Sequence, residues 1–576
     1  MSSRNKFFRS FLGENPVFGK PISPQQPPNA GTNTQHQGNQ SKNLTRRTNT
    51  GITPYVGAFG KPELLHLLRR SLFGVKMADI STFTGKTLEQ TVDALLTVSS
   101  TLPNPPLNDY GNTNNDPNVI YGQTWINAPY DAALNNFREK SLKRWFWDLM
   151  ANQSTDLQAK MVLFWHNHFA IQFLEIPLAS ASYVYSKLLF THALGNVKTL
   201  TRAITIDPAM LFYLNGRLNT KRAPDENYAR ELQELFAIGK GTNSNYTEDD
   251  VKAMARVLTG WSINILTNPA STGFVASNHD TNDKQFSSFY GNAIIKGQTG
   301  IDAGNKELDD LLSMIFKTEE SAAFLCRKLY TYFVYYEIDD TVEAKVIQPL
   351  AKVFRESGYD IKTVLKILLM SEHFFDNWNR ACVIKDPITQ QGGLCRQMEL
   401  AFPVTTDYAQ MYKMFQMGVD YGSLTQMVIG DPPNVSGWPA WYQKPVFNRS
   451  WINNDTLPKR NLFSDSLLVY GQKVGTAKVY VDPWIVTKKF SAPGTADTLI
   501  ADAIEFLLPM ALSTKQIASL KEILLPGAIP DYNWSDEYLS ATDVSDPNHT
   551  KSLNTATIKL RSLYKSIMNL AEYQLS

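Results

Sequence analysis

Residues 223–241 read APDENYARELQELFAIGKG, and this stretch decides the fold class that the sequence predicts. Pro224 and Asp225 would begin a helix, because proline suits the first helical turn and the helix dipole stabilises an acidic side chain there. Gly239 and Gly241 would end it. Between these limits, apolar side chains recur at the spacing of one helix face, at Tyr228, Leu232, Leu235 and Phe236. The segment therefore predicts an amphipathic helix.

The same spacing of apolar residues recurs through most of the chain. Further helices are predicted near 142–149, 156–170, 178–200, 247–259, 307–316, 319–335, 341–357, 361–370, 495–510, 514–524 and 551–575. Stretches rich in Pro, Gly and Asn predict long loops at 101–122, 215–224, 264–304, 428–462 and 526–548. Alternation typical of strands is best at 478–481 and 484–486. The sequence thus predicts a mainly α fold, a large multi-helix assembly with long loops and little strand.

Composition predicts three parts in the 576 residues. Residues 1–60 are rich in Asn, Gln, Pro, Thr and Gly and carry seven basic residues against one acid, so a flexible basic tail is expected. Residues 61–462 form the expected main helical domain, and 463–576 form a C-terminal helical segment packed on it.

Charge and hydropathy exclude some partners. The formal net charge of +2 gives no general attraction to nucleic acid, so no nucleic-acid partner is predicted. No apolar stretch is long enough to cross a bilayer, so no transmembrane segment is predicted. The N-terminus is basic but lacks the apolar region of a secretory signal, which predicts a cytoplasmic protein. Export by a route that the sequence does not reveal is the alternative.

The helix over 225–239 carries the densest candidate chemistry. At about 100° per residue, Asn227, Glu231 and Glu234 fall within an arc of roughly 60°. Two carboxylates this close need a cation or a shared proton, so they suit a divalent metal ion or an acid–base pair. The alternative is a solvated acidic stripe paired with Arg230 or with arginines of other helices.

Histidines supply the second set of candidates. In FWHNHFA (164–170), a helical backbone would place His166 and His168 roughly 200° apart, so the two could not reach one metal ion together. One would face a site while the other is a buried, hydrogen-bonded core residue. The other polar candidates are His192, Asp207, His279 and Asp280.

Seven stretches of the chain form one set of motifs: FWHNHFA (164–170), HALGN (192–196), DPAMLFYLNG (207–216), DENYARELQELFAIG (225–239), YTEDDVKAMARVLTGW (246–261), FLCRKLYTYFV (324–334) and DPPNVSGWPAW (431–441). In this order they resemble the bacterial family catalogued as domain of unknown function 1800, over most of the chain from about 60 to 460. The resemblance implies a helical fold. It also implies export in many bacteria, together with a second uncharacterised protein family as partner.

Two functional hypotheses remain open. In the first, the protein is a metal-assisted enzyme, hydrolytic or oxidative. Its catalytic residues would be Glu231, Glu234, Asn227 and Asp207, and its ligands to a divalent metal would come from His166, His168, His192, His279, Asp280 and the two glutamates. In the second, the protein is a helical scaffold without catalysis, and the aromatic loop 434–443 offers Trp438 and Trp441 to a polysaccharide or a partner protein.

Overall fold

The computed structural model describes residues 48–98, 102–111, 116–402, 407–444, 446–475 and 477–576. The tail predicted for residues 1–47 lies outside them and stays a prediction. Residues 48–60 do not behave as a tail, because the amide of Tyr55 donates to the carbonyl of Met370 at 2.8 Å and the amide of Glu372 donates to that of Thr53 at 2.8 Å. The packed part of the chain therefore includes Thr48.

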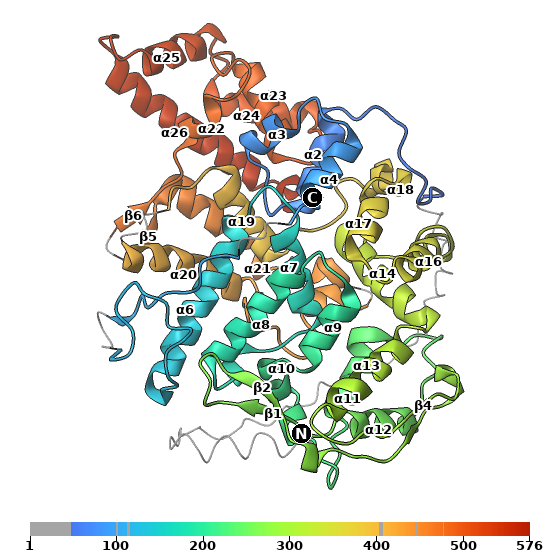
Figure 1. Ribbon diagram of the computed structural model, residues 1–576. Helices are drawn as coiled ribbons and strands as arrows, with labels where there is room; N and C mark the ends of the chain where they lie inside the picture. The colour runs from blue at the N-terminus through green and yellow to red at the C-terminus, as the bar shows by residue number, and fades with distance from the viewer. Residues whose placement is uncertain (1–47, 99–101, 112–115, 403–406, 445, 476) are drawn as a thin grey trace, which may run out of the picture. The chain divides into compact units, whose positions relative to one another are not determined.

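Helices dominate the described residues, as predicted (Figure 1). Up to Ile315 the described chain contains α2 (Lys61–Ser71), α3 (Met77–Phe83), α4 (Leu88–Leu95), α6 (Ala132–Ala151), α7 (Gln158–His168), α8 (Ala179–His192), α9 (Val197–Thr205), α10 (Pro208–Tyr213), α11 (Asn227–Glu231), α12 (Glu248–Val257) and α13 (Ala303–Ile315). From Glu319 onward it contains α14 (Glu319–Phe333), α15 (Asp340–Val342), α16 (Gln348–Glu356), α17 (Ile361–Leu369), α18 (Glu372–Phe375), α19 (Pro387–Gln397), α20 (Tyr408–Leu424), α21 (Thr456–Asp465), α22 (Pro483–Thr487), α23 (Ala496–Leu507), α24 (Thr514–Leu524), α25 (Tyr532–Thr542) and α26 (His549–Met568). The mainly α fold class is confirmed.

Strands in the described part of the chain form three antiparallel pairs. They are β1 (Trp261–Asn264) with β2 (Ser271–Phe274), β3 (Lys284–Gln285) with β4 (Ile294–Ile295), and β5 (Gln472–Val474) with β6 (Ala477–Val479). The predicted strand at 478–481 overlaps β6, but the one at 484–486 is wrong, because these residues lie in α22. Asp482 caps that helix by accepting from the amide of Trp484 at 3.0 Å, and Pro483 occupies its first turn.

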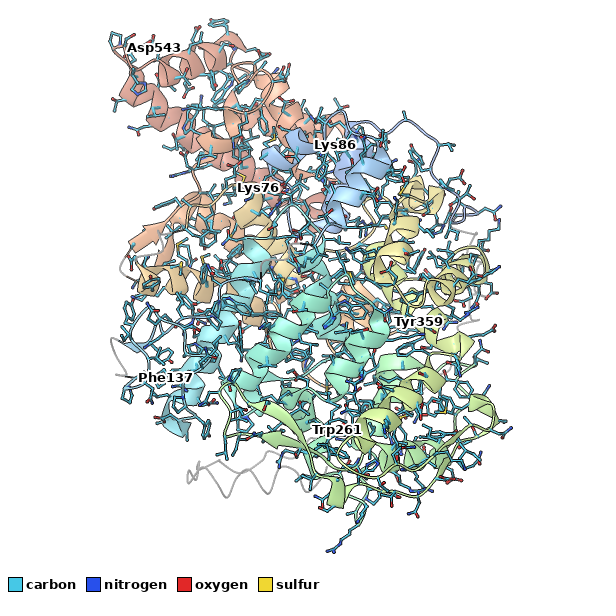
Figure 2. All side chains as sticks on the ribbon, viewed as in Figure 1. Lys76, Lys86, Phe137, Trp261, Tyr359 and Asp543 are labelled. Atoms are coloured by element: carbon cyan, nitrogen blue, oxygen red, sulfur yellow. The ribbon has the colours of Figure 1, made fainter. Side chains whose placement is uncertain are left out.

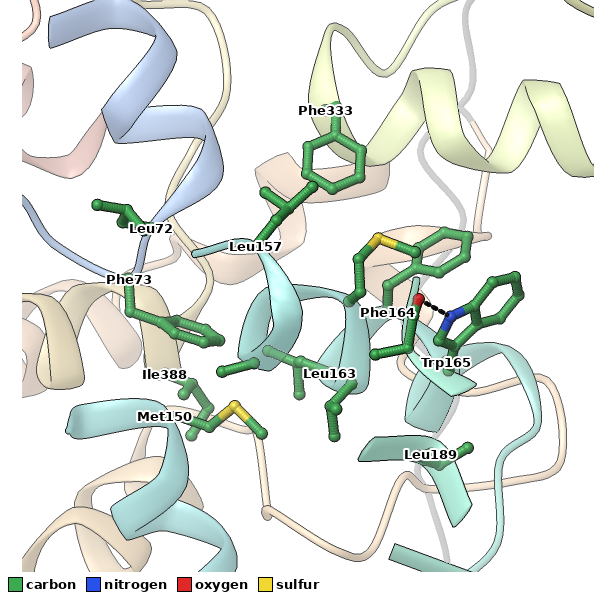
Figure 3. Close-up of a cluster of buried hydrophobic side chains, with 14 of the residues drawn as sticks. Leu72, Phe73, Met150, Leu157, Leu163, Phe164, Trp165, Leu189, Phe333 and Ile388 are labelled. Atoms are coloured by element: carbon green, nitrogen blue, oxygen red, sulfur yellow. Dashed lines mark hydrogen bonds between the residues drawn. The ribbon is translucent and has the colours of Figure 1, made fainter. Parts of the chain in front are cut away.

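The core is built around α7. Every residue of this helix except Asn167 is buried, which is the pattern of a helix enclosed on all sides. Figure 3 shows its Leu163, Phe164 and Trp165 among buried side chains of other segments, and the indole of Trp165 donates to the carbonyl of Ala193 at 2.8 Å. Side chains fill the spaces between the other helices in the same way (Figure 2).

The C-terminal segment returns to the first helix of the packed unit. Figure 1 places the C-terminus beside α2, and the ion pair between Lys61 and Glu505 joins α2 to α23. Near the chain end, the amide of Lys385 donates to the carbonyl of Gln574 at 2.8 Å. Segments far apart in the sequence therefore meet near α2. No helix in the described ranges is long and apolar enough to span a bilayer.

Candidate functional site

The predicted acidic cluster lies on a helix whose geometry changes in its middle. α11 ends at Glu231, and Leu232–Ala237 continues as a π-helix, so the step of 100° per residue does not extend from Glu231 to Glu234. Glu234 pairs with Lys240 at 2.7 Å and with Arg230 at 3.7 Å. The Asn227 side chain donates to the carbonyl of Leu214 at 3.2 Å. Burial, together with the charge of Glu234, raises the pKa of Glu231. These contacts match the alternative of an acidic stripe paired with Arg230.

His279 and Asp280 belong to a different, fully packed network. The Glu307 carboxylate bonds to His279 Nε2 at 3.0 Å, to Lys284 Nζ at 2.6 Å and to the amide of Gln298 at 2.8 Å. Arg256 binds Asp280 at 2.7 Å, and although burial opposes the shift, this arginine and backbone hydrogen bonds lower the pKa of Asp280 to about 2. His279, Lys284 and Glu307 are all buried. The network joins α12, α13 and β3, and its polar side chains are hydrogen-bonded to one another.

His166 and Asp207 are buried in the core. His166 Nδ1 donates to the hydroxyl of Tyr185 at 3.2 Å, because that hydroxyl itself donates to the carbonyl of Phe169. Burial lowers the pKa of His166 to about 3. Asp207 caps α10, with Oδ1 accepting from the amides of Ala209 and Met210 at 2.9 and 3.2 Å. Burial raises its pKa to about 7, and Oδ2 has no hydrogen-bond partner among the described residues.

The remaining histidines diverge as the helical pattern predicts. His168 Nε2 donates to the carbonyl of Phe236 at 2.9 Å, so it contacts a different element from His166. His192 is half-buried at the end of α8, and desolvation lowers its pKa. Across the ranges that the structure describes, no three His, Cys, Asp or Glu side chains gather where they could hold a metal ion. The predicted ligands are therefore not brought to one centre, and the catalytic roles stay predictions.

One cavity instead gathers basic side chains from four parts of the chain. It has a volume of about 50 Å³, which is room for a few water molecules or one small anion. Its cationic side chains come from α2, α7, α14 and the segment before α19: Arg69, Arg70, Lys160, Lys328 and Lys385. Among the described residues that line it, Asp386 is the one carboxylate side chain. We refer to this cavity as the basic pocket.

The carboxylate of Asp386 in the basic pocket already accepts hydrogen bonds from a neighbouring residue. Asp386 caps α19, and its two oxygens accept from the amide and the hydroxyl of Thr389 at 2.8 and 2.5 Å. The same hydroxyl accepts from Lys160 Nζ at 2.7 Å. The hydrogen bonds therefore connect Asp386 to Lys160 through Thr389, while the charge of Asp386 acts on Lys160 across the gap.

Backbone carbonyls hold the other cations in place. Arg69 donates to the carbonyl of Glu505 at 2.5 Å, Arg70 to that of Asn379 at 2.9 Å, and Lys385 to that of Tyr573 at 2.7 Å. Lys328 Nζ lies 5.0 Å from the ring centre of Phe324. A carbonyl or a ring fixes the position of a cation without cancelling its charge, so the pocket stays positive.

Burial lowers the pKa values of these cationic side chains. Desolvation lowers the pKa of Lys160 and of Lys328 to about 8 and that of Arg69 to about 10, and it lowers the pKa of Lys385 well below its usual range. Several polar atoms at the pocket also lack hydrogen-bond partners among the described residues: Arg69 Nε, Arg70 Nε and Nη1, and His168 Nδ1. Arg70 and His168 are only 3% and 2% exposed. Buried polar atoms normally have a hydrogen-bond partner, and a bound ligand or water molecule would supply one here.

Aromatic side chains form the wall of the basic pocket at its mouth. They come from α14, from the residues just after it and from the loop that follows α20, and they are Tyr332, Tyr336, Trp441, Tyr442 and Phe447. The Trp441 and Tyr332 ring centres are 5.4 Å apart. The loop is fixed to α7 where the amide of Trp438 donates to Asn167 Oδ1 at 2.8 Å. Gly437 is needed there, since its φ is +87° and a Cβ atom would lie 2.2 Å from the same oxygen.

Sequence reasoning finds this pocket only in part. His168, Lys328 and Trp441 stand in motifs that carry the family resemblance, and the aromatic loop is predicted as a ligand platform. The basic cluster is missed because the net charge of +2 averages over the whole chain. Its members are separated by up to hundreds of residues, and of the five only Lys328 stands in one of these motifs, so no local pattern brings them together.

The fold and the pocket define a large, mainly α-helical protein with a buried, positively charged cavity under an aromatic wall. The chain belongs to the family described as "Protein of unknown function (DUF1800)", whose model matches residues 66–575. The resemblance that the motifs carry is thereby confirmed. No curated protein and no solved structure matches the chain.

Proposed function

We propose that the basic pocket binds a small anionic ligand. The observation that carries the proposal is the excess of buried cations over carboxylates in one enclosed space. Buried charges in proteins are normally paired, because an ion without a partner loses several kcal/mol of solvation free energy. Asp386 is the one acidic side chain in the described lining and stands against five cationic side chains, so an anion from outside completes the pairing.

The free energy lost when the pocket is empty can be estimated from the pKa of Lys160. Its side chain is buried, and desolvation lowers its pKa from 10.5 to about 8, equivalent to about 3 kcal/mol against the charged form. An anion within hydrogen-bond distance would raise the pKa of Lys160 and Lys328 again and recover this free energy. Binding and protonation of these lysines are therefore coupled.

An anion site suits either of the two functional hypotheses. In an enzyme, the cations would orient the acidic group of a substrate beside His168. In a binding protein, the same cations and the wall at Trp441 would hold the ligand without changing it. A partner protein of the kind that accompanies the family could deliver or receive such a ligand.

The experiment removes the pocket cation that has no hydrogen bond to a described residue. Lys328→Gln deletes the charge and shortens the side chain by one atom, and the half-buried position limits the effect on folding. Lys198→Gln is the matched control, because Lys198 is also half-buried, its Nζ lies 4.9 Å from the ring centre of Tyr359, and neither residue lines the pocket. Inorganic phosphate is titrated by calorimetry and by its effect on the melting temperature.

We expect phosphate to bind the wild type and Lys198→Gln alike. Lys328→Gln should bind it about tenfold more weakly, since a hydrogen bond to a charged group contributes about 1.5–3 kcal/mol. If phosphate leaves the melting temperature of the wild type unchanged, or if both variants bind it equally well, the pocket is not an anion site.

A further inference from the structure

His168 gives the basic pocket a hydrogen-bond acceptor in addition to its cationic side chains. Its Nε2 donates to the carbonyl of Phe236, which fixes the proton on that nitrogen. Desolvation, with the nearby charge of Lys328, lowers the pKa of His168 well below its usual range, so the ring stays neutral. Nδ1 is then an acceptor, and no described residue donates to it. A ligand that fits this nitrogen must carry a hydroxyl or amine donor.

Neutral polar groups line the basic pocket together with His168. The Asn167 amide uses Oδ1 to hold the loop at Trp438, which leaves its Nδ2 as a donor. Ser436 and the buried Asn448 also line the pocket. A purely apolar tail on the anion would leave these groups without partners, and burying them unpaired is unfavourable. The part of the ligand at the mouth is therefore polar.

The wall adds a flat apolar surface to this polar rim. Trp441 is half-buried and Tyr442 is 38% exposed, so their rings are within reach of a bound molecule. Trp438, Trp451 and Tyr332 contact Trp441 with ring centres 5.4–5.9 Å away and nearly perpendicular planes, which holds its indole in place. A fixed indole face beside hydroxyl-binding groups is suited to the C–H face of a sugar ring.

We propose that the ligand of the basic pocket is an anionic sugar, a pyranose or a polyol that carries a carboxylate or a phosphate. This inference rests on the proposed function, because the acidic group occupies the cationic interior near Arg70, Lys160 and Lys328. A hydroxyl of the sugar donates to His168 Nδ1, and the ring lies against Trp441. The cavity volume of about 50 Å³ accommodates the acidic group, and the ring lies against the half-buried Trp441.

The test compares ligands that contain both recognition elements with ligands that contain one. D-glucuronate, D-galacturonate and D-glucose 6-phosphate carry a ring and an acidic group, and they distinguish a carboxylate from a phosphate source. D-glucose lacks the anion, whereas acetate and phosphate lack the ring. Affinities are measured by calorimetry on the full chain.

Two variants test which residues give the protein a preference for acidic sugars over simple anions. Trp441→Leu removes the indole face at a half-buried position, and His168→Phe removes the acceptor while keeping an aromatic ring in the core. Each should weaken the best acidic sugar by about tenfold and leave phosphate or acetate almost unaffected. If His168→Phe does not fold, the affinities of Trp441→Leu and of the wild type for the same ligands are sufficient to test the inference.

The outcomes separate this inference from the proposed function. At least one acidic sugar binding about tenfold more tightly than both its matching simple anion and D-glucose, with the gain lost in Trp441→Leu, supports the inference. Equal binding of acidic sugars and simple anions overturns it and leaves anion binding intact. Binding of no anion at all overturns both.

Discussion

Asp207 offers a direct test of how strongly the core desolvates a carboxyl group. Its side chain is 2% exposed, and it caps α10 through Oδ1 while Oδ2 has no partner among the described residues. Asp207→Asn keeps an oxygen for the cap, because asparagine is as good a helix cap as aspartate. The substitution therefore removes the ionisation and little else.

The size and sign of the effect follow from the raised pKa. The unfolded carboxyl group loses its proton near 3.8 and the folded one near 7, so between these values the folded state binds more protons and its stability falls as the pH rises. The full difference corresponds to about 4 kcal/mol above pH 7. A cooperative unit of about 500 residues unfolds with an entropy of about 1 kcal/mol per kelvin, which converts this into about 4 °C.

The assay is the melting temperature of the wild type and the variant across this pH range. Asp207→Asn should melt about 4 °C higher than the wild type at about pH 8 and should match it near pH 4. Asp360→Asn is the control, since Asp360 caps α17 in the same way, accepting from the amide of Thr363 at 2.9 Å, but is half-buried. A gain for Asp207→Asn that does not change with pH would refute the argument from desolvation.

Three further predictions follow from other buried groups. Phosphate affinity should fall as the pH rises through about 8, because Lys160 and Lys328 lose the protons that bind the anion; calorimetry at several pH values measures this. Glu307→Gln should lower the melting temperature by about 3–5 °C, because it leaves Lys284 charged and buried, a loss of about 3–5 kcal/mol. Glu231→Gln, assayed for bound metal and for melting temperature, should lose metal if the predicted metal site exists and should keep zero metal if it does not.

Helix positions could be predicted because they depend on local spacing. The segment from 156 to 170 is predicted from its apolar periodicity, and α7 occupies Gln158–His168. The strand predicted at 484–486 fails for an equally local reason. Three alternating residues are a weak pattern, whereas an Asp-Pro pair immediately before them is a strong signal for the start of a helix.

The acidic cluster was harder to predict because the backbone departs from α geometry. Asn227, Glu231 and Glu234 share an arc only if the helix keeps 3.6 residues per turn. The π-helix from Leu232 to Ala237 changes that spacing, and such a change has no simple sequence signal. The basic pocket depends instead on packing between distant segments, so neither periodicity nor composition could locate it.

The way this protein treats its other buried cations strengthens the case for a ligand. Arg138 binds Asp116 at 3.0 Å, and Arg396 binds Asp79 at 2.5 Å, with all four side chains at most 5% exposed. Lys143 is paired with Asp431 in the same way. The fold thus neutralises these three buried cations with carboxylates, whereas it holds those of the basic pocket with backbone carbonyls, a hydroxyl and aromatic rings. A region that only needed to be stable would gain from acids or apolar side chains at these positions. Positive charge that is fixed in place but not cancelled is useful when an anion from outside completes it.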